Sequence, residues 1–143
     1  SNTDVVSCQT LHTNAFDTAI GSGFDTIAQT GTTQKLDAVS EVLYFRAQHS
    51  RFVGHSSVIL SHVVDVGANH AAMRWYELRD ANDGVFNIFQ QGTFSPDAAH
   101  RWMGSAAMDG DGNIGLAYTA TWPMAASPVC ATRAASPATH WGR

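Results

Sequence analysis

The chain has few charged residues and almost no lysine. Only 14% of its 143 residues are charged, against about 25% in an average soluble domain, and Lys35 is the single lysine. The net charge is −4 and the arginines are scattered, which argues against a nucleic-acid partner because binding to phosphates requires clustered basic side chains. Surface polarity must come from Ser, Thr, Asn, Gln and His, a composition that indicates a secreted or cell-surface β protein.

Long hydrophobic runs are also missing. The apolar stretches extend over only a few residues, as at 58–60, whereas a membrane-spanning helix needs about 20, so we expect no membrane span. The first residues, Ser1 to Asp4, have neither a basic region nor an apolar stretch, which predicts that no signal peptide is present. Earlier removal of a signal peptide and an internal fragment would both explain this start.

Cysteine is scarce as well, with Cys8 and Cys130 near opposite ends of the chain. In an oxidising compartment a disulfide between them would join the two ends and stabilise the fold by about 4–5 kcal/mol on the chain-entropy model. Two free buried thiols are the alternative, and two cysteines alone do not decide between them.

The sequence contains a series of segments with the alternation of β-strands. Residues 56–66 and 71–79 alternate most clearly, and an Asp83-Gly84 turn, a strong hairpin signal, precedes the next segment. The expected strands are 39–48, 56–66, 71–79 and 85–94, followed by 100–108 and 114–122 around a turn at 109–113. No helical pattern separates them, so the sequence predicts an all-β fold of antiparallel meander sheets.

Four consecutive strands in a meander form one blade of a β-propeller, and a small β-sandwich is the alternative. We therefore divide the chain into an irregular segment at 1–34, a propeller-like blade and a half at 35–122, and a Pro/Ala-rich tail at 123–143. The first segment could hold a short strand or helix, and the tail a short edge strand at 140–143. The alternating positions of Trp75 and Trp102 place both in the core.

Several motifs resemble a repeat segment of large secreted bacterial proteins. They are RWYELR (74–79), QQGTFSPD (90–97), HRWMGSAAMD (100–109) and GNIGLAY (112–118), with similar stretches at 33–46, 62–66 and 140–143. The resemblance implies a propeller-like fold with sialidase-type blades and an extracellular setting, and no defined activity. Because a propeller has about four to eight blades, we expect either a fragment of a longer chain or several copies that complete one ring.

One candidate ion site comes directly after strand 100–108. Asp109, Asp111 and Asn113 have the D-x-D-x-N spacing that opens a calcium loop, which makes Ca²⁺ the one candidate cofactor. The Gly expected next is Ile114, and Ala120 stands where the bidentate Glu belongs. The favoured interpretation is therefore a turn in which Asp and Asn bond their own backbone.

Sialidase-type catalysis needs arginines that hold a carboxylate, a Tyr nucleophile activated by a Glu, and an acidic Asp. The residue types occur, but Tyr76 and Glu77 are neighbours on one strand and must point to opposite faces. They cannot form that pair with each other, which disfavours catalysis.

Three residues are candidates for ligand binding. Trp122 and Trp141, in or beside the Pro-rich tail, could stack on sugars, and Arg101 could bind a ligand or, alternatively, pair with Asp97 across a short loop. The sequence thus predicts an extracellular binding or scaffold module for a glycan or protein. A sialidase-like hydrolase and a piece that functions only in assembly with other chains remain as alternatives.

Overall fold

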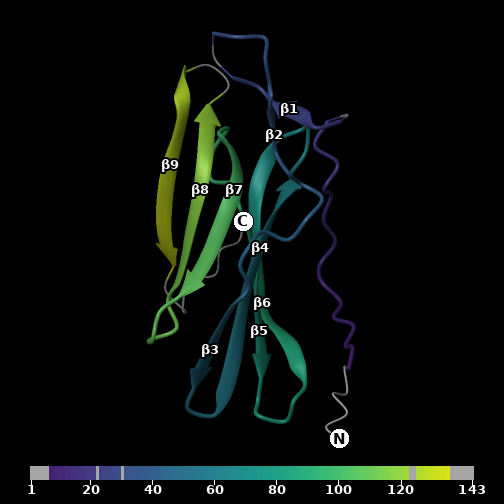
Figure 1. Cartoon of the computed structure of the whole chain (residues 1–143), viewed down its shortest axis with the longest axis vertical. Helices are drawn as coiled ribbons and strands as arrows, with labels where there is room; N and C mark the ends of the chain where they lie inside the picture. The colour runs from purple at the N-terminus through teal and green to yellow at the C-terminus, as the bar shows by residue number, and fades with distance from the viewer. Residues whose placement is uncertain (1–6, 22, 30, 123–124, 136–143) are drawn as a thin grey trace, which may run out of the picture.

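The fold is all-β, as the computed structural model of the chain shows (Figure 1). The structure describes residues 7–21, 23–29, 31–122 and 125–135, with the side chains of 122 and 125–135 left out. Within these ranges every regular element is a strand, and no helix has the length and apolar character that crossing a membrane requires.

The strands form three antiparallel sheets. A short ribbon joins β1 and β2, a four-stranded meander has the order β3-β4-β5-β6, and a three-stranded meander has the order β7-β8-β9. Their bounds are β1 Asp25–Ile27, β2 Leu36–Asp37, β3 Gln48–Phe52, β4 His55–Asp65, β5 Ala71–Asp80, β6 Phe86–Phe94, β7 His100–Met108, β8 Ile114–Trp122 and β9 Ala125–Ala135. The antiparallel meander and the five strands β4 to β8 are confirmed, with bounds within one residue of those expected.

The expected strand at 39–48 is wrong over most of its length, because pairing with β4 begins only at Gln48. The preceding segment turns instead: Val39 has a φ of 49° and its N–H donates to Asp37 Oδ1 at 2.8 Å. The Tyr44 hydroxyl donates to the Ala38 carbonyl at 2.6 Å and accepts the Met103 N–H at 3.1 Å. These bonds fix a compact loop, and the apolar run that indicated a strand partly faces solvent.

The tail is more regular than expected. Strand β9, Ala125–Ala135, pairs with β8 along nearly its whole length, so the prediction of a loop there is wrong. Strand β9 is the last of its sheet, and an edge strand tolerates proline because one side of its backbone needs no partner. The short strand expected at 140–143 lies outside the described residues, and within 7–34 the regular element is β1.

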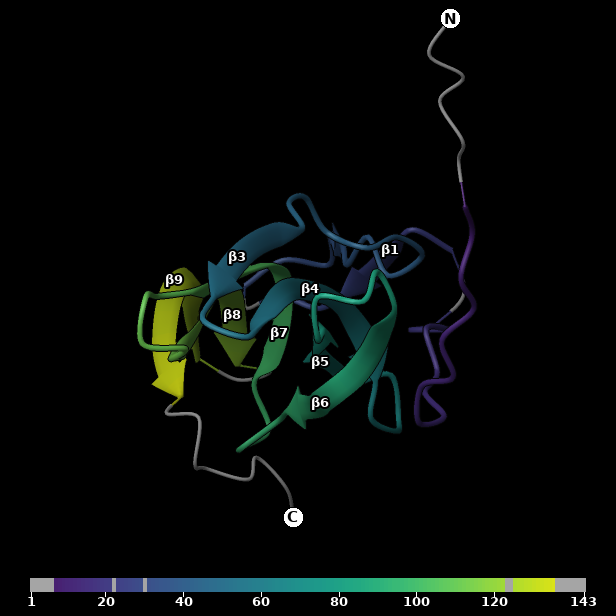
Figure 2. The same ribbon diagram turned by 90° about the horizontal axis from the view of Figure 1, so that it is seen from below.

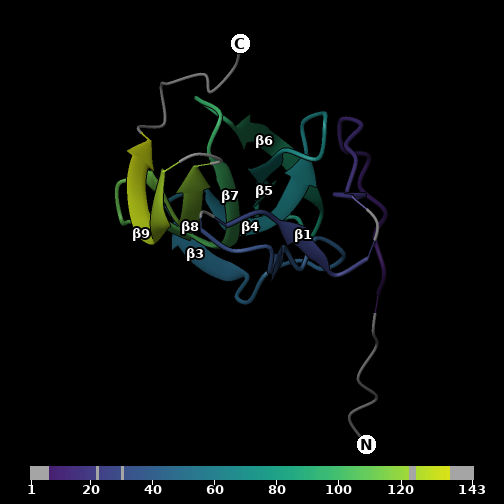
Figure 3. The ribbon, with the colours of Figure 1, turned by 90° about the horizontal axis from the view of Figure 1, so that it is seen from above.

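The two larger sheets pack against one another through a shared core (Figure 2). Trp75 and Met73 of β5 and Phe94 of β6 meet the buried apolar residues of β7 and β8, among them Leu116 and Tyr118. Trp75 and Trp102 are each 3% exposed, which confirms their predicted place in the core. The opposite face of the four-stranded sheet points away from β7–β9, and the N-terminal segment lies on that side (Figure 3).

Candidate functional site

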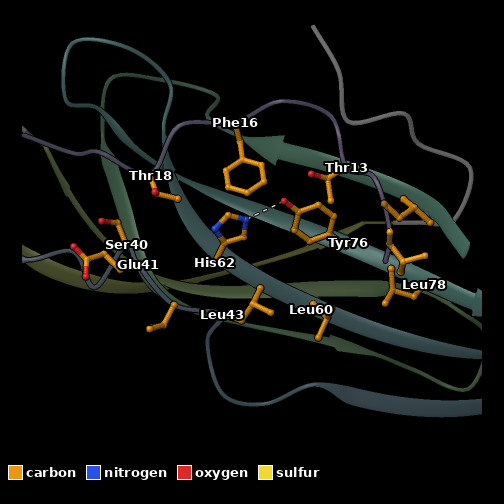
Figure 4. Close-up of a pocket in the computed structure, with 13 residues that line it drawn as sticks. Thr13, Phe16, Thr18, Ser40, Glu41, Leu43, Leu60, His62, Tyr76 and Leu78 are labelled. Carbon is orange, nitrogen blue, oxygen red and sulfur yellow. Dashed lines mark hydrogen bonds between the residues drawn. The ribbon is translucent and has the colours of Figure 1, made fainter. Parts of the chain in front are cut away.

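An open groove of about 470 Å³ lies on this outer face of the four-stranded sheet (Figure 4). Strands β4, β5 and β6 form its floor, and two irregular segments, the N-terminal arm (residues 9–18) and the loop 40–43, form its walls. We call it the outer groove. Its lining residues are Leu11, Thr13, Phe16, Thr18, Ser40, Glu41, Val42, Leu43, Leu60, His62, Tyr76, Leu78 and Ile88.

The floor results from strand alternation. Leu60 pairs with Tyr76 in the ladder between β4 and β5, so both side chains point to the same face of the sheet. His62 and Leu78 lie two residues further along their strands and therefore share that face. The opposite face of β4 carries Ile59, which belongs to the core between the sheets. Strand β4 is thus apolar on both faces, and its outer face needs a cover of its own.

The N-terminal arm is held at both ends. The Gln9 side-chain amide donates to the Phe86 carbonyl and accepts the Phe86 N–H at 3.0 Å, like a strand partner at the edge of β6. At the other end Asp17 forms a bridge with Asp65, whose N–H donates to the Asp17 carbonyl at 2.8 Å. The arm thereby places Phe16, 48% exposed, over the sheet.

Three aromatic rings meet at the centre of the outer groove. His62 Nε2 lies 2.9 Å from the Tyr76 hydroxyl, with the two rings nearly parallel at an angle of 5°. Phe16 approaches the His62 ring edge-on, with centroids 4.9 Å apart. Burial of the imidazole, assisted by the nearby positive charge of Arg74, holds the pKa of His62 below its ordinary value of 6.5. The centre of the outer groove is therefore aromatic and uncharged at neutral pH.

This depressed pKa predicts a loss of stability on acidification. Between pH 6.5 and the lower pKa of folded His62, the unfolded chain binds more protons than the native chain, so stability falls as the pH falls through that window. The slope is at most about 1.4 kcal/mol per pH unit for each such histidine. Burial and the nearby His70 lower the pKa of His100 as well, which adds to the effect.

Urea unfolding between pH 7.5 and 5.5 measures the predicted loss of stability. The His62→Gln variant should lose less stability over this range than the wild type does. A variant with the unchanged pH dependence would contradict the assignment to His62.

Tyr76 and Glu77 point to opposite faces of β5, as the sequence predicts. Glu77 is 0% exposed and lies on the core side of β5. Its carboxylate accepts hydrogen bonds from Ser57 Oγ at 2.9 Å and from Gln90 Nε2 at 2.6 Å. It also forms an ion pair with Arg79. A Tyr nucleophile activated by its neighbouring Glu therefore does not form here.

Arg101 has the structural contacts that the sequence offered as the alternative to ligand binding. It is 4% exposed, and its guanidinium donates to Asp97 at 2.7 Å and to the Ala99 carbonyl at 3.0 Å. The bond from Arg101 holds the pKa of Asp97 below its usual range. The guanidinium also lies 5.3 Å from the Phe94 ring centroid and 5.5 Å from that of Tyr118. Arg101 therefore stabilises the junction of the two sheets and does not line the outer groove.

The candidate calcium residues form the favoured turn. Asp109 Oδ1 accepts the N–H groups of Asp111 and Asn113, each at 2.9 Å, and Oδ2 accepts Asn113 Nδ2 at 2.9 Å. These bonds, that from the Asn113 side chain above all, lower the pKa of Asp109. Both carboxylate oxygens of Asp109 thus accept hydrogen bonds within the turn. Within the described residues no three His, Cys, Asp or Glu side chains converge as metal ligands would.

The remaining predicted residues lie partly or wholly outside the described part of the structure. The backbone of Trp122 ends β8 and pairs with Ala125, but its side chain is not described, and Trp141 is not described at all. Cys8 is exposed, and the Cys130 side chain is not described. The stacking of Trp122 and Trp141 on sugars and the disulfide between Cys8 and Cys130 therefore remain predictions.

The chain matches none of the family models, curated proteins or solved structures with which it was compared. Its candidate site thus stands on its own geometry. The sequence analysis missed the outer groove, because it assigned no functional role to His62, Phe16 or Leu60. The available signal was the pattern of β4, whose two faces are both apolar.

Proposed function

We propose that the chain is a non-catalytic binding module that takes an apolar part of a protein ligand into the outer groove. A groove of about 470 Å³ falls within the range of about 300–1,000 Å³ typical of ligand sites. The observation that carries the proposal is the combination of this open volume with apolar walls. Leu43 is 58% exposed and Val42 52% exposed at the rim.

The composition of the lining favours a protein ligand over a glycan. Sugars present hydroxyl groups at every position and need polar partners spread along a site. Here Thr18, Ser40 and Glu41 lie together at one end (Figure 4), and the floor is lined by Leu60, Leu78 and Ile88. An aliphatic or aromatic side chain buries its surface there at a gain of about 25 cal/mol per Å².

We further propose that the two packed sheets act as successive propeller-like blades of a secreted or cell-surface protein. Few charges and abundant Ser, Thr and Asn support that setting, and the four-stranded meander has the strand order of a blade. A closed ring would place a further blade on the outer face, so the outer face carries the ligand only where the two blades stand as an open pair.

Binding to a neutral, end-blocked peptide with adjacent leucine and phenylalanine tests the proposed function. Calorimetric titration should detect binding of this peptide but not of a trisaccharide such as maltotriose. The Leu60→Ser variant should bind about five- to tenfold more weakly, because it removes about 1 kcal/mol of apolar contact. Val58→Ser, on the same strand and face but outside the lining, is the matched control. Binding of the sugar alone, or equal affinity of the two variants, would contradict the proposal.

Assembly with other chains is a second candidate function. Phe45 is 85% exposed and Val53 is fully exposed at 104%, and large apolar side chains this open often mark contacts between proteins. Light scattering on a size column decides this point. A stable multiple of the mass of one chain would support assembly, and the mass of a single chain would contradict this second candidate function.

A further inference from the structure

We propose that the preferred occupant of the outer groove is a protein segment in which an apolar anchor is followed closely by lysine or arginine. This inference rests on the proposed function and names its ligand more closely. The apolar anchor would occupy the aliphatic end of the groove, and the basic side chain would extend along the aromatic centre to Glu41.

The two ends of the outer groove differ in chemistry, as Figure 4 shows. Leu78 lies at one end beside its ladder partner Ile88, with Thr13 on the same side; Ser40, Glu41 and Thr18 lie together at the other end. A ligand that satisfies both ends must itself be apolar at one end and polar at the other. This arrangement sets the direction in which a bound segment would run.

Charge decides which polar group suits the second end. Glu41 is exposed, and within the described residues neither an ion pair nor a hydrogen bond engages its carboxylate. Among the lining residues it alone carries a formal charge at neutral pH, since burial keeps His62 neutral. Thr18 and Ser40 beside it offer hydroxyl oxygens that can accept from an ammonium or guanidinium group. The whole chain, with a net charge of −4, also attracts a basic ligand.

The positive charge of Arg74, which acts on His62, does not oppose this arrangement strongly. Arg74 is 7% exposed and is not part of the lining. Its guanidinium donates to Thr93 Oγ1 at 3.0 Å and to Gln91, and it lies 5.3 Å from the Tyr76 ring centroid. Hydrogen bonds to β6 therefore hold the charge of Arg74 on the β6 side of Tyr76. Glu41 instead lies in the loop 40–43, which forms one wall of the groove.

The aromatic centre suits the stem of a basic side chain. Phe16 presents a half-exposed ring above His62, and the alkyl stem of lysine or arginine packs well along such a surface. A guanidinium can also stack on the ring face, which contributes about 0.5–1 kcal/mol at exposed sites. Because the groove lies on a sheet face and not at an edge, side chains rather than strand pairing would provide the recognition.

Three end-blocked peptides of equal length test the inference. All three carry the same leucine-phenylalanine anchor and differ at one later position, which is arginine, glutamine or glutamate. The spacing between the anchor and this position is the same in all three and is chosen between one and four residues. Fluorescence anisotropy gives their affinities for the wild type, for Glu41→Gln and for Asp111→Asn. The two variants remove one negative charge each from a chain of net charge −4, but Asp111 lies in the turn between β7 and β8.

For the wild type and for Asp111→Asn we expect the arginine peptide to bind about two- to fivefold more tightly than the glutamine peptide, which is typical of one partly exposed ion pair. Glu41→Gln should abolish this preference, and higher salt should reduce it in the wild type. A preference for arginine that survives in Glu41→Gln, or equal affinities of all three peptides for the wild type, would overturn the inference and leave the proposed function standing. Failure of all three peptides to bind would instead overturn the proposed function.

Discussion

Replacing Arg101 by alanine is expected to lower the free energy of unfolding by about 2–4 kcal/mol, within the range for a lost buried network, and to leave binding in the outer groove unchanged. The side chain is 4% exposed, and its guanidinium lies beside the rings of Phe94 and Tyr118, whose centroids are 5.7 Å apart, at the junction of the sheets. Alanine would remove both ring contacts and leave a cavity. The ion pair itself contributes the smaller part, because Asp97 is 43% exposed and regains water when it is left alone.

Urea unfolding of three variants separates these contributions. Arg101→Lys keeps the charge but lacks the planar guanidinium that bonds Asp97 and the Ala99 carbonyl together. Its free energy of unfolding should lie between those of the wild type and Arg101→Ala. Asp97→Asn should cost about 1 kcal/mol or less. If Arg101→Ala were as stable as the wild type but failed to bind a peptide or glycan ligand, the structural role would be wrong and the ligand-binding alternative would be restored.

Replacing Gly104 by valine is expected to lower the free energy of unfolding by about 3 kcal/mol, and replacing it by alanine by about 1–2 kcal/mol. Losses of this size are typical of an overpacked core. A Cβ atom at Gly104 would meet the Met73 side chain well inside contact distance and would lie 3.2 Å from the Ala117 carbonyl oxygen. Met73 is 0% exposed and packs in the core between the sheets. It can move aside only by displacing its neighbours, and the carbonyl belongs to the backbone of β8.

Gly110→Ala is the matched control in the adjoining turn, where a new Cβ atom would meet nothing within 4 Å. Its free energy of unfolding should stay within about 0.5 kcal/mol of the wild type. The Met73→Ala change should partly relieve the Gly104→Ala strain in the double variant, because the two residues share one space. Strictly additive losses would show that the side chain of Met73 is not what excludes the Cβ atom.

The confirmed strands are those with a clear local signal in the sequence, either alternation or a flanking turn. Residues 56–66 and 71–79 alternate with period two, and the turns at Asp83-Gly84 and 109–113 mark where the later strands begin and end. The error at 39–48 arose because an aromatic and aliphatic run has no alternation to decide its conformation. Tertiary bonds of Tyr44 to Ala38 and Met103 decide it instead. Strand β9 was missed because proline counted against a strand, although an edge position accepts it.

The candidate site was harder to predict for a related reason. Local rules suffice for pairs on one strand or one short loop, which is why the opposed directions of Tyr76 and Glu77 and the pairing of Arg101 with Asp97 were predictable. The outer groove instead joins segments far apart in the sequence. The N-terminal arm reaches it through bonds such as that between Gln9 and Phe86, 77 residues apart, and no local pattern encodes such a contact.

An amide chemical-shift map of the ¹⁵N-labelled chain, titrated with the neutral leucine-phenylalanine peptide, tests the central claim most directly. A ligand in the outer groove should shift the amides of residues 11–18, 40–43, 60–62 and 76–78 together, and leave the turn at 109–113 unchanged. Shifts confined to the β7–β9 sheet or to that turn would place the ligand elsewhere and contradict the proposed site. The absence of any shift at millimolar peptide would contradict the binding function itself.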